Sequence, residues 1–133
     1  MGKFSLSKIK ETCLYVKDLE VTKSFYSNML GLELISFVPN RHVFFRVGDE
    51  VLLCFDPKAT EVETSLPPHF AYGKQHIAFE VAKDQYDSWK ETLTKSGVSI
   101  THEHHWKEDL YSFYFNDPDG HVLEILMPGI WDK

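Results

Sequence analysis

The chain has 133 residues, of which 43% are hydrophobic and 26% are charged, and its formal net charge is −6. This composition is typical of a folded globular protein and excludes intrinsic disorder and fibrous structure. No apolar run reaches the roughly 18 residues that a membrane-spanning helix needs, and the acidic balance argues against nucleic-acid binding. We therefore expect a cytoplasmic protein whose partner is a small-molecule substrate, with no nucleic acid and no membrane among its partners.

The predicted elements describe one short module that occurs twice. The first module, about residues 8–56, is predicted to contain a strand at 9–16, a helix at 19–30, and strands near 32–38, 41–47 and 51–55. A linker at about 57–73 precedes the second module, about 74–128, with a strand at 75–81, a helix at 83–96, and strands near 98–105, 110–115 and 121–127. The predicted fold is α+β, a single domain over 1–133 whose paired βαβββ modules form a curved, partly closed mixed sheet with the helices outside.

Strand alternation places three ligand-capable side chains on the sheet faces that point away from the helices. Successive strand side chains point to opposite faces, and Glu11, His76 and Glu124 alternate with apolar residues that suit a helix. A carboxylate in an apolar strand is costly unless it is paired, hydrogen-bonded or bound to a metal. A shared metal site and three separate structural roles both remain open on this evidence. The same parity predicts five further cavity residues, Tyr15, Leu52, Cys54, Ser112 and Tyr114.

Two other groups of residues carry weaker signals. Glu80 shares the predicted face of His76 and is a candidate catalytic base. The cluster HEHHW, residues 102–106, is interpreted as a solvated or adventitiously metal-binding strand, because alternation puts His102 and His104 on one face and His105 on the other. We expect Trp106, at the end of this cluster, to act as a lid over the cavity.

Three stretches of the chain resemble one protein superfamily, the vicinal oxygen chelate superfamily. Its closing strand pair resembles YSFYFNDPDGHVLEIL, which starts at Tyr111. Its opening strand and helix resemble LYVKDLEVTKSFYSNMLGLEL, from Leu14, and its mid-chain strand resembles GKQHIAFEV, from Gly73. Members include glyoxalase I, extradiol dioxygenases, fosfomycin-resistance enzymes and bleomycin-resistance proteins. The resemblance covers nearly the whole chain, and it implies the same paired βαβββ fold.

The resemblance also implies a metal site. The family's ligand positions match Glu124 in DPDGHVLEI and His76 in HIAF, and Glu11 occupies the place where many members have a histidine. One imidazole and two carboxylates favour a divalent ion such as Mn, Fe(II), Zn, Ni or Mg. Ser112 and Tyr114 match the pair that contacts substrate in the fosfomycin-resistance enzymes.

The implied function is that of a metal-dependent enzyme of glyoxalase type, resembling lactoylglutathione lyase or a related lyase or isomerase. Such an enzyme acts on a small oxygenated substrate through a metal-stabilised enolate or alkoxide. Two alternatives stay open, a non-catalytic drug-binding protein of the bleomycin-resistance type and an extradiol-type dioxygenase. Cys54 stands where glyoxalases have a fourth-strand glutamate. The resemblance further implies a homodimer, with its modules packed side by side or exchanged between chains.

Overall fold

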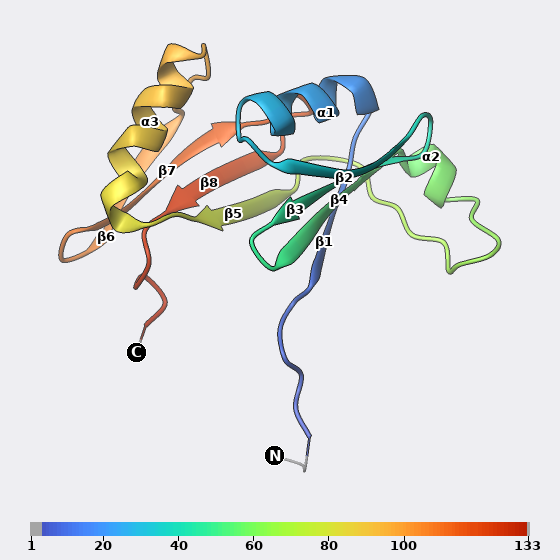
Figure 1. Ribbon diagram of the computed structural model, residues 1–133, viewed down its shortest axis with the longest axis horizontal. Helices are drawn as coiled ribbons and strands as arrows, with labels where there is room; N and C mark the ends of the chain where they lie inside the picture. Colours follow the sequence, from blue (N-terminus) through green and yellow to red (C-terminus); the bar gives the residue numbers. More distant parts are fainter. Residues whose placement is uncertain (1–3, 133) are drawn as a thin grey trace. The chain divides into compact units, whose positions relative to one another are not determined.

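The computed structural model describes residues 4–132, and its internal contacts divide the chain into two compact units. The first unit ends at Tyr72 and the second begins at Gly73. Each unit contains one four-stranded mixed sheet and a ten-residue helix, in the order βαβββ (Figure 1). The predicted α+β class and the duplicated module are therefore confirmed. Among residues 4–132, no helix is both long enough and apolar enough to cross a membrane.

The first unit has the strand order β1-β4-β3-β2, with β1 parallel to β4 and the other pairs antiparallel. Its elements are β1 (Glu11–Tyr15), α1 (Leu19–Asn28), β2 (Glu33–Val38), β3 (His42–Val47), β4 (Glu50–Phe55) and α2 (Pro57–Thr60). The short helix α2 lies within the predicted linker. It forms because the Asp56 side chain accepts a hydrogen bond from the Lys58 amide and Pro57 occupies the first turn.

Helix α1 begins where Asp18 caps it, since the carboxylate accepts hydrogen bonds from the backbone amides of Glu20 and Val21. Its buried residues, Leu19, Thr22 and Tyr26, recur at helical spacing. The Tyr26 ring packs 5.5 Å from the Phe45 ring of β3. This contact fixes which face of the first sheet the helix covers.

The strand register corrects one prediction about the first sheet. Leu52 pairs with Thr12 and Cys54 pairs with Leu14, which is fully buried on the face that α1 covers. Paired residues of neighbouring strands point to the same face. Leu52 and Cys54 therefore lie opposite Glu11, and their predicted place among the cavity residues is wrong.

The residues that do share the face of Glu11 are its strand mates Cys13 and Tyr15 together with Val51, Leu53 and Phe55 of β4. The final strand of the first module is offset by one residue from the position that counting from Cys54 to Glu124 suggests. Leu53 is opposite Cys13 in β4, and Glu124 is opposite Ala78 in the second unit. Leu53 is therefore the structural counterpart of Glu124.

The second unit has the strand order β5-β8-β7-β6, with β5 parallel to β8. Its elements are β5 (His76–Glu80), η1 (Lys83–Gln85), α3 (Tyr86–Lys95), β6 (His102–Lys107), β7 (Leu110–Asn116) and β8 (Val122–Leu126). The predicted strand at 98–105 begins only at His102. Gly97 ends the helix with a φ of 89°, and the Val98 amide returns to the Leu93 carbonyl, so the chain needs several residues to reach the sheet.

The core of the second unit lies between α3 and the apolar face of its sheet. The Tyr86 ring packs 5.3 Å from the Phe113 ring, and both residues are buried. Leu93, Leu123 and Ile125 complete this apolar layer. The opposite face of the sheet carries His76, Tyr114 and Glu124.

A tight turn, DPDG, sets the start of β8 and of β5. The Asp117 carboxylate accepts hydrogen bonds from the amides of Asp119 and His121, each at 2.9 Å. Gly120 adopts a φ of 84°, which an L side chain rarely adopts. The buried His121 ring then accepts the Gln75 amide through Nδ1 at 3.0 Å. The turn therefore positions the residue immediately before His76.

Two adjacent leucines test the corrected register. Leu52 is 2% exposed and faces α1, whereas Leu53 is half-buried on the other face. We expect Leu52→Ala to lower the free energy of unfolding by about 2–5 kcal/mol, because it leaves a cavity under the helix. Leu53→Ala should lower the free energy of unfolding clearly less, and urea titration of both variants measures the difference. A larger loss for Leu53→Ala than for Leu52→Ala would contradict the register.

Candidate metal centre

The second unit brings together two of the predicted ligands, His76 and Glu124. His76 begins β5, and Glu124 lies in the middle of the neighbouring strand β8. The Nε2 atom of His76 lies 3.3 Å from Oε1 of Glu124. The imidazole is 51% exposed, but the carboxylate is only 7% exposed. A charge withdrawn from water to that extent needs a compensating partner.

A backbone hydrogen bond determines which nitrogen of His76 faces Glu124. Nδ1 lies 2.8 Å from the Val122 carbonyl oxygen. A carbonyl can only accept, so Nδ1 must carry the proton. Nε2 is left to face the carboxylate, either with a second proton or with its lone pair. A bare lone pair opposite a carboxylate would be repulsive, so a positive charge belongs between these two atoms.

The separation of the two atoms fits a shared metal ion. Zinc binds imidazole nitrogen at about 2.0–2.1 Å and carboxylate oxygen at about 2.0–2.2 Å. Two such ligands at octahedral or tetrahedral angles are about 2.9–3.4 Å apart. The observed 3.3 Å between Nε2 and Oε1 lies in this range. The pair therefore fits two first ligands of a divalent ion.

Tyr114 and Ser112 adjoin this pair on the same face of the sheet. Tyr114 pairs with Glu124 across β7 and β8, and its ring stacks on the His76 imidazole with centroids 6.2 Å apart. Burial is the main cause that raises the pKa of the Tyr114 hydroxyl. A hydrogen bond that Ser112 donates to the phenol oxygen lowers the pKa. The negative charge of Glu124, and the hydrogen bond that the phenol donates to it, raise the pKa further. The phenol therefore stays protonated well above neutral pH and can act as a hydrogen-bond donor.

Trp106 covers the Ser112 end of this face. Its indole Nε1 donates a hydrogen bond of 2.9 Å to Oγ of Ser112, which is fully buried. Trp106 itself remains 41% exposed. The Trp106 ring therefore lies beside the polar side chains of Ser112, Tyr114 and Glu124. Whether Trp106 works as a lid stays a prediction.

The other predicted site residues lie elsewhere. Glu11 begins β1 of the first unit, and its side chain is exposed. Its assignment as a third ligand stays a prediction. Tyr15 shares its face and contacts Nδ1 of His69 at 2.6 Å through its hydroxyl. Glu80 shares the face of His76, but it stands four residues further along β5, about 13 Å away. Its role as a base stays a prediction.

Sequence reasoning missed two contributors to the pair. One is the Val122 carbonyl, which fixes the His76 proton, and the other is His121, which anchors the preceding Gln75. A backbone acceptor leaves no trace in a sequence. Within the part of the chain that the structure describes, no three His, Cys, Asp or Glu side chains gather as a metal site. The candidate centre therefore rests on the pair His76 and Glu124.

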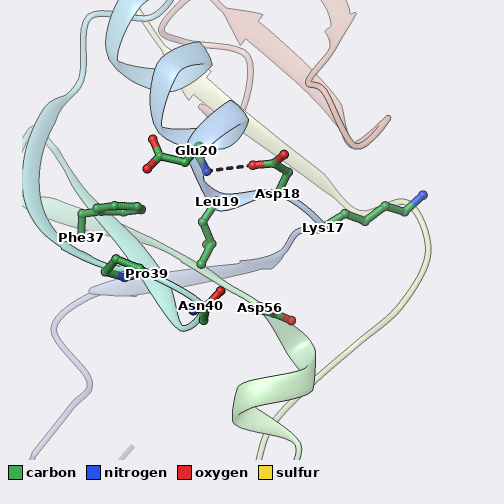
Figure 2. A pocket seen from close by; sticks show the side chains of 8 residues that line it. All are labelled: Lys17, Asp18, Leu19, Glu20, Phe37, Pro39, Asn40 and Asp56. Carbon is green, nitrogen blue, oxygen red and sulfur yellow. Dashed lines mark hydrogen bonds between the residues drawn. The ribbon is translucent and has the colours of Figure 1, made fainter.

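A separate pocket of about 270 Å³ lies in the first unit, beside the start of α1 (Figure 2). Two of its acidic residues are already engaged, since Asp18 caps α1 and Asp56 caps α2. Figure 2 shows the Asp18 carboxylate directed at the Glu20 amide. None of the predicted site residues lines this pocket.

Comparison with known proteins identifies the family. The model of the Glyoxalase/Bleomycin resistance protein/Dioxygenase superfamily matches residues 8–125. This chain belongs to that superfamily.

The relatives of this chain include two transferases and a lyase. It is 33% identical to a glutathione transferase, FosA, of Serratia marcescens, over 90% of this chain and 80% of that protein. It is 32% identical to a metallothiol transferase, FosB, of Lysinibacillus sphaericus, over 97% and 88%. The crystal structure of a lactoylglutathione lyase from Agrobacterium tumefaciens superimposes with a TM-score of 0.91 at 34% identity, covering 96% of this chain and 98% of the other.

The coupling between Tyr114 and Glu124 can be measured directly. Glu124→Gln should lower the pKa of Tyr114, because it removes the negative charge that helps to raise it. The tyrosinate absorbance would be titrated in both proteins and in the matching Tyr114→Phe variants, which isolate this phenol. Glu80→Gln, on the same face, is the control and should leave the titration unchanged. An unchanged or higher pKa in Glu124→Gln would contradict the contact.

Proposed function

We propose that the chain is a divalent-metal-dependent enzyme that acts on a small oxygenated substrate. His76 and Glu124 supply two ligands, and Glu11 stays the third ligand that the family resemblance implies. Mn, Fe(II), Zn, Ni and Mg all suit an imidazole combined with carboxylates. The observation that carries the proposal is the 3.3 Å approach of His76 Nε2 to the buried Glu124 carboxylate, with the Nδ1 proton held by Val122.

When bound, a divalent ion at this pair would polarise a substrate oxygen as a Lewis acid. The surrounding side chains would bind and orient the substrate. On substrate binding, the Tyr114 hydroxyl would turn its one proton from Glu124 to a second substrate oxygen, while Ser112, which donates to the phenol oxygen, would hold that oxygen in place. Trp106 would keep water from one side of the substrate. A substrate with two neighbouring oxygens fits this set of donors best.

The leading reaction is that of a lyase or isomerase of glyoxalase type. The likeness to the lactoylglutathione lyase structure extends over almost the whole of both chains, which supports this choice. The second candidate is transfer of a thiol to an oxygenated acceptor. It is favoured by the two thiol transferases among the relatives and by the position of Ser112 and Tyr114 beside Glu124. Both candidates share a low-molecular-weight thiol as a reactant or product.

Metal analysis tests the centre. Protein purified without chelators should contain a divalent ion, and His76→Ala and Glu124→Ala should lose it. His105→Ala is the matched control, because His105 pairs with Tyr111 on the opposite face of the sheet. Glu11→Ala tests the third ligand separately. A wild-type protein that stays free of metal after reconstitution with Mn, Zn, Ni and Fe(II) would overturn the proposal.

Activity assays then separate the two reactions. The metal-loaded protein would be assayed for interconversion of lactoylglutathione with its aldehyde and thiol, and for addition of glutathione to small oxygenated electrophiles. Chelation should abolish the active reaction, and the divalent ion should restore it. Loss of activity in Tyr114→Phe, with the metal content unchanged, would support the donor role of this hydroxyl. Metal binding without either reaction would leave the centre standing and refute both reaction assignments.

A further inference from the structure

A continuous row of rings crosses the face of the second sheet that carries His76 and Tyr114. Beyond His76 and Tyr114 lie His102, His104 and Trp106 of the edge strand β6. The His102 ring is 5.7 Å from Tyr114 and 5.9 Å from His104, and the His104 ring is 4.5 Å from Trp106. The register confirms that His102 and His104 share this face, whereas His105 points to the other. Both histidines are exposed.

The spacing of these two imidazoles suits chelation. A transition metal binds imidazole nitrogen at about 2.0–2.1 Å, so two imidazoles on one ion have ring centroids roughly 4.5–5.5 Å apart. The observed 5.9 Å is slightly longer. Rotation of two exposed side chains closes that difference easily, since such side chains change rotamer freely. Neither ring has to leave its face of the strand.

We propose that His102 and His104 form a second metal site, a bidentate imidazole site for Cu(II) or Ni(II). The ligand chemistry differs from that of the first centre. The pair His76 and Glu124 combines an imidazole with a carboxylate, whereas this site offers two neutral nitrogen donors, which suit Cu(II) and Ni(II). Tyr114 stands between the two sites, since its ring contacts both His76 and His102. The second site is therefore adjacent to the first but uses separate ligands.

Trp106 supplies a built-in reporter for this site. Its ring lies edge-on to His104 at 4.5 Å, and its Nε1 is held by Ser112. Paramagnetic Cu(II) on the His104 imidazole would quench the Trp106 indole at this range. The other tryptophans, Trp89 and Trp131, lie outside this row. A Trp106→Phe variant therefore identifies the quenched component.

The experiment is a Cu(II) titration of the full chain, followed by tryptophan fluorescence. We expect saturable quenching that Trp106→Phe removes. His102→Ala and His104→Ala should each weaken the apparent affinity at least about tenfold, because the second imidazole of a chelate acts at high effective concentration. His105→Ala, on the same strand but the opposite face, should bind as the wild type does. Glu124→Gln should leave this binding unchanged, which separates it from the first centre.

Electron paramagnetic resonance provides a second readout that does not depend on Trp106. Two equivalent imidazole nitrogens should couple to the Cu(II) signal in the wild type, and one in each single variant. Equal affinity in the wild type and in the single variants, or weakening in His105→Ala of the same size, would mean adventitious binding by single imidazoles. Either result would overturn the proposal. Failure here would leave the first centre untouched, because the two sites share no ligand.

Discussion

The hydrogen bond between His76 Nδ1 and the Val122 carbonyl is the interaction on which the account of this protein depends. It settles the tautomer of the imidazole and turns Nε2 toward the buried Glu124 carboxylate. Because the lone pair of Nε2 and the carboxylate oxygen repel each other, a proton or a metal ion between them relieves the contact, and the backbone of β8 thereby prepares a place for one. The DPDG turn supports the same geometry from behind, since His121 holds the residue that precedes His76. The backbone around Val122 thus determines which nitrogen of His76 is available to face Glu124.

The two modules have the same architecture but differ in chemistry. In the second unit, His76 on the parallel edge strand meets a carboxylate on its neighbour. In the first unit, Glu11 begins the corresponding strand, and Leu53 takes the place of Glu124. Because Leu53 is apolar, Glu11 has no carboxylate at the position that Glu124 occupies relative to His76. Duplication of a βαβββ module, followed by divergence at a few sheet positions, accounts for one unit in which His76 lies beside Glu124 and another in which Glu11 shares its face of the sheet with Leu53.

Most of the architecture was predictable from the sequence, because alternation, helix caps and turns are local signals. Asp18, Gly97 and the DPDG turn define element boundaries through their own side chains or backbone angles. The face of the sheet to which a strand side chain points is harder to predict from sequence. A one-residue offset sent Leu52 and Cys54 to the wrong side, since their parity depends on the register with β1 and not on β4 alone. Alternation correctly placed His76 and Glu124 on one face of the sheet, and likewise His102 and His104, but the Val122 acceptor is a backbone atom that only the structure reveals.

Nitrogen-15 NMR of the histidine side chains tests the central claim most directly. In protein labelled at the imidazole nitrogens, Zn(II) should shift the Nε2 resonance of His76 strongly and leave Nδ1 protonated, because Val122 retains that proton. His76→Ala identifies the resonance, and Glu124→Gln should weaken the response to Zn(II). Binding of Zn(II) through Nδ1, or a His76 spectrum that does not change when Zn(II) is added, would contradict the account.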